Sequence, residues 1–197
     1  MINTGLKTII LSLVLLGSTL SAGTSSYEPN TKSLVGLEGG YSSLDYESGV
    51  NLNNSQGDTG LANLGLKIGA ETRDFRVFLS GRYFYDSSSR YDYLTTIGGE
   101  IQYKFNPSKA FNIFLGVNAG LANAKTRIEG ESFSRTFSDF YVGGDLGTNI
   151  HLGKATDLEL GARVMSIQST NTKNDVSYRI GNIVNVYASL IFKWSMD

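Results

Sequence analysis

The chain has 197 residues, a length typical of one domain, and a formal net charge of −1. This near-neutral charge gives no electrostatic reason to expect a nucleic-acid partner. The sequence contains no cysteine, which excludes disulfides, thiolate metal sites and cysteine nucleophiles. Proline occurs only twice, as long uninterrupted strands require.

Residues 1–22 have the pattern of a signal peptide. Lys7 supplies a positive charge, residues 9–16 form an apolar core, and small residues follow. The apolar core is too short for a membrane-spanning helix, which needs about 20 apolar residues. We therefore expect export, with cleavage near Ala22. Residues 23–33 are polar and predict a periplasmic N-terminal linker before a domain at 34–197.

Eight later segments alternate apolar and polar residues with a period of two, which predicts β-strands. They cover residues 34–45, 60–70, 74–85, 91–105, 111–123, 138–152, 157–167 and 184–194. Tight connections at 71–74, 106–110 and 153–156 alternate with longer polar ones at 46–59 and 125–136, and with intermediate ones at 86–90 and 170–177. The pattern predicts an all-β fold, an eight-stranded antiparallel up-and-down β-barrel with both ends of the barrel domain on the side of the tight turns.

Aromatic residues on the apolar faces are sorted by height. One group lies beside the tight turns, a second lies toward the longer connections, and aliphatic residues fill the middle. Two aromatic girdles around an aliphatic band are typical of membrane–water interfaces, whereas a soluble core has no reason to sort its aromatics. We therefore expect a transmembrane barrel whose apolar face meets lipid. The predicted lipid-interface aromatics are Phe75, Tyr83, Tyr91, Tyr93, Tyr103, Phe105, Phe111, Phe192 and Trp194.

The opposite faces of the strands carry charges of both signs. An eight-stranded barrel is just wide enough for side chains to fill it, and unpaired charges in a narrow interior are costly. We expect an ion-pair network in the lumen, obstructed further by inward aromatics; the alternative is a polar pore lining. The predicted network consists of Glu38, Lys67, Arg76, Arg82, Glu100, Lys104, Asp145, Glu159 and Arg163.

The sequence predicts no catalytic, cofactor or metal site. The single histidine, His151, lies on the polar face near a tight turn and has no serine two residues later, because Gly153 stands there. One histidine without a converging cluster does not form a metal site. The connection at 49–60 is rich in Asn and Gly and predicts a flexible surface loop rather than a calcium loop.

In this architecture the chain resembles the small eight-stranded outer-membrane β-barrel proteins, the family that contains the barrel domain of outer-membrane protein A and the opacity-type porin-like proteins. The resemblance covers residues 34–194 and includes the last strand, VNVYASLIFKW, which is similar to the signal read by the outer-membrane assembly machinery. That signal usually ends in an aromatic residue, whereas three residues follow Trp194 here. The resemblance implies the outer membrane of a Gram-negative cell, with its lipid and the assembly machinery as partners.

Three classes of function remain open. The first is a non-enzymatic barrel with a structural or adhesin-like role, whose extracellular loops contact a host or another cell surface. The second is a narrow porin-like channel for ions or small solutes. The third is a soluble lipocalin-like barrel with an apolar ligand inside, which the aromatic girdles oppose. None of the three requires a cofactor.

Overall fold

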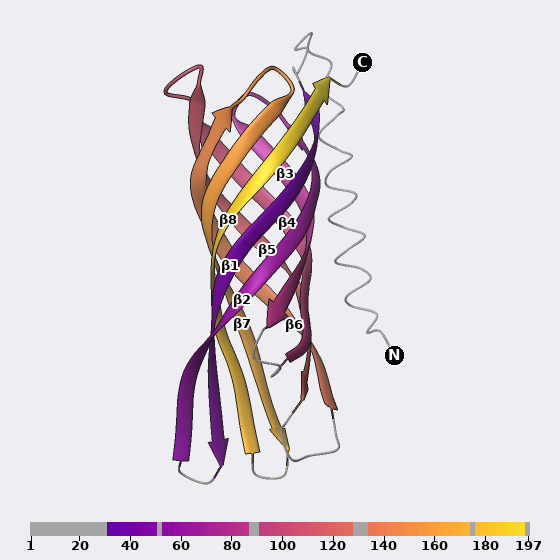
Figure 1. Ribbon diagram of the computed structural model, residues 1–197, viewed down its shortest axis with the longest axis vertical. Helices are drawn as coiled ribbons and strands as arrows, with labels where there is room; N and C mark the ends of the chain where they lie inside the picture. Colours follow the sequence, from indigo (N-terminus) through magenta and orange to yellow (C-terminus); the bar gives the residue numbers. More distant parts are fainter. Residues whose placement is uncertain (1–30, 51–52, 87–90, 128–133, 174–175, 196–197) are drawn as a thin grey trace, which may run out of the picture.

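The computed structural model describes residues 31–50, 53–86, 91–127, 134–173 and 176–195. Its strands close into a barrel in chain order, each antiparallel to its neighbours (Figure 1). The predicted eight-stranded up-and-down barrel is thereby confirmed. The strands are β1 (Lys32–Val50), β2 (Asn53–Glu71), β3 (Phe75–Asp86), β4 (Tyr91–Phe105), β5 (Phe111–Arg127), β6 (Ser134–His151), β7 (Thr156–Lys173) and β8 (Val176–Ser195).

The two ends of the barrel differ. At one end, here called the turn end, short turns at 72–74, 106–110 and 152–155 connect the strands. Backbone hydrogen bonds tighten these turns, such as the one from Thr72 N to Phe75 O at 2.9 Å. β1 begins and β8 ends at this end of the barrel. At the other end, here called the hairpin end, several strands continue well beyond the last apolar alternation.

The predicted long connections are therefore wrong in their bounds. Only residues 51–52 separate β1 from β2, although the sequence predicted a loop over 46–59, and residues 49–50 and 53–60 of the expected flexible loop belong to strands. The connections at 125–136 and 170–177 are shortened in the same way. Backbone pairing does not require apolar side chains, so it continues where the alternation stops. β1 also begins at Lys32, two residues inside the segment predicted as a linker.

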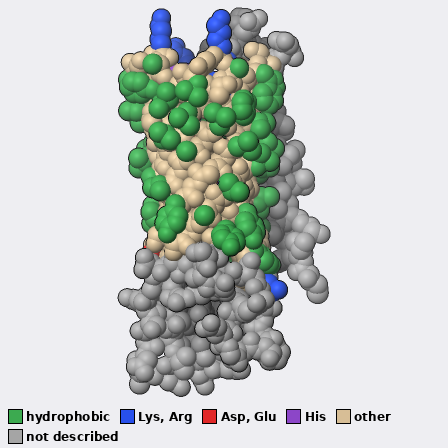
Figure 2. Space-filling model, in the orientation of Figure 1, with side chains coloured by type: hydrophobic (Ala, Val, Ile, Leu, Met, Phe, Trp, Pro, Cys, Tyr) green, Lys and Arg blue, Asp and Glu red, His purple; other side chains and the backbone are tan. Residues whose placement is uncertain are grey.

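The outer surface of the barrel is apolar. Leu64, Val117, Leu146 and Val186 are among the outward side chains that are more than half exposed. Figure 2 shows hydrophobic side chains spread over the described part of the barrel wall as an apolar band, with Lys and Arg side chains protruding at the turn end. Among the described residues, no helix is long and apolar enough to cross a membrane.

Most of the predicted interface aromatics lie on this outer surface. At the turn end, Phe75 and Tyr103 form an edge-to-face pair with ring centroids 5.1 Å apart, and Phe105 packs against the same Tyr103 ring at 4.7 Å. Tyr93 is half-buried, and the side chain of Tyr91 lies outside the described part of the structure. The other outward aromatics of the predicted set are Tyr83, Phe111, Phe192 and Trp194.

Inward aromatic rings lie against inward glycines of other strands. A Cβ on Gly161 would stand 2.6 Å from the Tyr187 ring, and a Cβ on Gly147 would stand 2.6 Å from the Phe114 ring. A Cβ on Gly98 would similarly meet the Tyr141 hydroxyl. The glycines therefore provide the space in which bulky rings fill a narrow lumen.

Candidate functional site: the barrel interior

The turn end of the lumen holds a layer of ion pairs. Arg76 Nε lies 2.8 Å from Glu71 Oε2, and Arg76 Nη2 lies 2.5 Å from Asp157 Oδ2. Lys104 Nζ lies 2.9 Å from Glu71 Oε2, and Lys193 Nζ lies 2.8 Å from Asp157 Oδ1. Two carboxylates, one from β2 and one from β7, are thus bound by cations from β3, β4 and β8.

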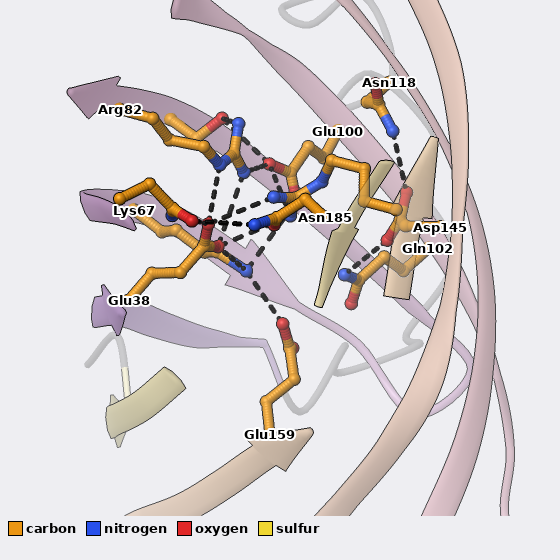
Figure 3. A network of polar contacts seen from close by, with 12 residues as sticks. Glu38, Lys67, Arg82, Glu100, Gln102, Asn118, Asp145, Glu159 and Asn185 are labelled. Carbon is orange, nitrogen blue, oxygen red and sulfur yellow. Dashed lines mark hydrogen bonds and ion pairs between the residues drawn. The ribbon is translucent and has the colours of Figure 1, made fainter. Parts of the chain in front are cut away.

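A second layer of ion pairs crosses the middle of the lumen (Figure 3). Glu38 on β1 is its centre: Lys67 Nζ lies 2.9 Å from Oε2, Arg82 Nε lies 2.8 Å from Oε1, and Arg163 Nη1 lies 3.0 Å from Oε1. Arg82 also binds Glu100 on β4, and Arg163 Nη2 lies 3.3 Å from Glu100 Oε2. These five side chains are no more than 3% exposed, so each charge depends on its protein partners rather than on bulk water.

Glu159 joins the two layers. Its Oε1 accepts from Lys67 Nζ at 2.7 Å, and its Oε2 lies 3.4 Å from Arg76 Nη1. The Tyr187 ring lies against the same charges, with Lys67 Nζ 4.5 Å and the Arg163 guanidinium carbon 4.3 Å from its centroid. Such cation–π contacts are stronger where water is excluded.

Asp145 differs from its expected role as a member of an ion pair. Among the described residues it has no cation within 4.0 Å; Gln102 Nε2 donates to its Oδ2 at 3.0 Å and Asn118 Nδ2 donates to its Oδ1 at 3.2 Å. Arg163 stands opposite Asp145 in the β6–β7 register, but its guanidinium binds Glu38 and Glu100 instead. Amide donors therefore compensate this carboxylate.

Toward the hairpin end the lumen becomes apolar. Ten side chains, drawn from all eight strands, form one cluster in which each is at most 2% exposed. This apolar layer consists of Leu44, Leu61, Phe84, Leu94, Ala122, Ala124, Tyr141, Met165, Ile167 and Ile183. It lies in the lumen on the hairpin side of the ion pairs, and its side chains are buried there.

Sequence reasoning missed the apolar layer and part of the turn-end layer. The sequence predicts Glu71 in a turn and Asp157 at a strand start, and the predicted network omits Lys193. All three nevertheless lie at inward-facing positions of their strands. The apolar layer carried the same signal: Leu61, Met165 and Ile183 occupy inward positions. Their hydrophobic character gave no indication of burial in a lumen expected to be polar.

His151 is half-buried at the turn end, on the inward face of β6. Its Nδ1 lies 2.8 Å from Asp157 Oδ1, and Asn112 Nδ2 lies 3.5 Å from its Nε2. Both contacts are to polar groups of the turn-end layer. Among the described residues, no group of three or more His, Cys, Asp or Glu side chains is arranged to hold a metal ion.

Comparisons with known proteins agree with the barrel architecture. The solved structure of Neisserial surface protein A is 17% identical, covers 80% of this chain and 97% of its own, and superposes with a TM-score of 0.60. The outer membrane protein OprG from Pseudomonas aeruginosa is 11% identical, covers 85% of this chain and 98% of its own, and superposes with a TM-score of 0.57. Outer membrane protein H (OprH) from P. aeruginosa is 19% identical, covers 83% of this chain and 99% of its own, and superposes with a TM-score of 0.55. At these identities the likeness is one of fold.

No curated protein matches the sequence. The family model described as "Outer membrane protein beta-barrel domain" matches residues 11–192, nearly the whole chain. The chain therefore belongs to the family of outer membrane protein β-barrel domains, and its strands form a transmembrane barrel.

Proposed function

We propose that this protein is a closed, non-enzymatic barrel that serves as a rigid scaffold for surface interactions at its hairpin end. The observation that carries the proposal is the filled lumen. Two ion-pair layers and an apolar layer follow one another along the barrel axis, and their side chains are almost completely buried. An ion crossing this interior would have to separate buried ion pairs and then pass an apolar core, both of which are costly.

The hairpin end is the end that faces outward in this proposal. Its β-hairpins extend beyond the apolar band, and their sequences are polar, such as NNSQGDTG at 53–60. Short turns and both barrel termini then face the periplasm, as export through a cleaved signal peptide at 1–22 requires. The last strand would be the segment that the assembly machinery reads. Among the described residues His151 contacts Asp157 and Asn112, and no hydroxyl nucleophile is hydrogen-bonded to it, which favours a non-enzymatic barrel.

A narrow channel is the second candidate, and electrical recording separates the two. The refolded protein is added to a planar lipid bilayer beside the Arg82→Gln and Glu100→Gln variants. A closed barrel gives no stable conductance in the unaltered protein. A stable conductance that either substitution abolishes would assign the middle layer to a conducting path and contradict the proposal.

The surface role needs a separate measurement. Bacteria producing the full protein are compared with bacteria producing a variant that lacks residues 46–57, in attachment to host-cell monolayers and in aggregation with one another. An epitope placed between residues 50 and 53 establishes that the hairpin is exposed on intact cells. We expect the shortened hairpin to lower attachment or aggregation. Equal values for the two strains, at equal amounts of folded protein, would refute a surface role for this hairpin.

A further inference from the structure

The barrel wall is open between β6 and β7 at the hairpin end. Pairing between these strands begins at His151↔Asp157 and stops at Tyr141↔Ile167. Both strands nevertheless continue in extended conformation, β6 over residues 134–140 and β7 over residues 168–173. Two strand edges thus face each other without pairing among the described residues; they are called here the β6–β7 seam.

Pairing between β2 and β3 also stops at this end, at Leu61↔Asp86, but the two hairpins that border the seam stay paired farther out. β6 stays paired with β5 as far as Arg127↔Ser134, and β7 stays paired with β8 as far as Lys173↔Val176. β8 in turn pairs with β1 up to Val50↔Val176. Figure 1 shows the β5–β6 and β7–β8 hairpins leaving the barrel as separate ribbons. Each seam edge is therefore held in strand conformation by its own hairpin.

The apolar layer explains where the seam begins. Tyr141 and Ile167, the last paired residues, belong to this layer and are at most 2% exposed. Below them, packing inside the lumen holds β6 and β7 together. Within the described residues the apolar layer does not extend beyond them. The β7–β8 register also shifts between Ser166 and Ser169, as a β-bulge would shift it.

Unpaired strand edges bind extended chains, because their free N–H and C=O groups match those of another strand. Natural proteins usually protect such edges with proline or many charges. The segments SRTFSDF at 134–140 and QSTNTK at 168–173 contain no proline, and the second is uncharged except for Lys173. Six residues of strand span about 20 Å, a length sufficient for a stable main-chain ladder.

We propose that the β6–β7 seam is a docking site for an extended polypeptide segment of another protein, which adds as a β-strand to one or both seam edges. The proposal rests on the surface function proposed above and names the class of partner. Recognition is through the main chain, so the partner is defined by an extended, proline-free segment rather than by a fixed sequence. The mostly polar sequences of the two segments favour a partner segment of mixed polar character.

The test uses a fluorescent peptide that copies residues 134–140, a proline-free segment of mixed polar character that is extended in β6. It is titrated onto the full protein in lipid vesicles, beside a peptide with proline at the positions of Thr136 and Ser138. We expect saturable binding of the first peptide and at least about tenfold weaker binding of the second. Equal affinity for the two peptides, or no binding of the first, would overturn the proposal.

The absence of cysteine allows a second, independent test by stapling. Thr136→Cys and Thr172→Cys would face each other if the β6–β7 register continued, so their disulfide closes the seam. The matched control, Thr126→Cys with Arg135→Cys, staples β5 to β6, which are already paired. We expect the oxidised seam staple to abolish peptide binding, with recovery on reduction, and the control staple to leave binding unchanged. Binding that survives the seam staple would contradict the proposal.

Failure here is distinct from failure of the surface role. If residues 46–57 are needed for attachment but no peptide binds the seam, strand addition at β6–β7 is wrong while the surface function stands. Hydrogen exchange provides a third readout that does not depend on introduced cysteines. Bound peptide is expected to slow exchange of amides within 134–140 or 168–173, and to leave those of β3 unchanged. Protection confined to other strands would place the peptide elsewhere.

Discussion

At the scale of single residues, Glu38 is the side chain on which the middle layer depends. It compensates three buried cations, Lys67, Arg82 and Arg163, at 2.8–3.0 Å. We expect Glu38→Gln to lower the free energy of unfolding by about 3–5 kcal/mol, because it leaves buried charges without their partner. Urea unfolding in vesicles, followed by the fluorescence of Trp194, the only tryptophan, measures the loss.

The matched control for Glu38→Gln is Asp74→Asn, the same chemical change at the surface. Asp74 lies 3.9 Å from Arg73, and both side chains are at least half exposed. Solvent screens this pair, so the substitution should change stability by no more than about 1 kcal/mol. Equal losses for the two variants would mean that the middle layer is hydrated rather than sealed.

Inward glycines should tolerate an added methyl group less well than outward glycines. In Gly161→Ala the new Cβ would lie 2.6 Å from the Tyr187 ring, which Lys67 and Arg163 hold in place. We expect a loss of about 1–3 kcal/mol from overpacking. In Gly99→Ala the nearest atom lies at 3.8 Å, so the expected change is within about 0.5 kcal/mol. Unfolding curves of the two variants, measured side by side, give the two changes in stability. A larger loss of stability for Gly99→Ala than for Gly161→Ala would contradict this account.

At the scale of elements, strand existence and facing were predictable from sequence, while strand length was not. The alternation that predicted a strand at 34–45 ends where β1 leaves the apolar band, although β1 continues to Val50. The same holds for β7, predicted to end at 167 and extending to Lys173. Period-two patterning reports burial on one face, and it disappears where both faces meet water, whether or not pairing continues.

The extensions beyond the band should therefore contribute little to barrel stability. Within the described residues, the apolar layer ends at residues such as Leu44 and Leu61, before the outer half of the β1–β2 hairpin. We expect the variant lacking residues 46–57, rejoined by Asn-Gly, to fold with the heat-modifiable gel migration of the full protein. Deleting Leu66 and Lys67 instead removes a buried cation of the middle layer and should abolish folding. A hairpin variant that failed to fold would show that the extension is part of the folding core.

At the scale of the whole molecule, the interior was predictable in its charges but not in its layering. The alternation of inward and outward residues along each strand is enough to place Glu38, Lys67 and Arg163 on the polar face. The structure brings these three side chains into contact. Which carboxylate meets which cation depends on the stagger between strands, which no local pattern records. Asp145 shows this limit, because the side chains that bind its carboxylate are the amides of Gln102 and Asn118.

The turn end carries an excess of exposed basic residues, one in each turn: Arg73, Lys109 and Lys154. They lie next to the aromatic residues that border the apolar band, at the depth of lipid headgroups. We expect the protein to be more stable in anionic than in zwitterionic vesicles, by up to about 1 kcal/mol for each basic residue near the surface. Replacing all three with Gln should remove most of this difference, as should high salt.

The control for these three substitutions removes equal charge at the other end of the barrel. Arg127, Lys173 and Arg179 lie on the strand extensions at the hairpin end, beyond the apolar band. Charges farther from the headgroups than a Debye length, about 8 Å at physiological salt, interact with them weakly. Replacing this second set with Gln should leave the difference between the two lipids nearly intact. If both sets reduce it equally, the effect reflects net charge, and the asymmetry of the barrel ends plays no part in holding it in the bilayer.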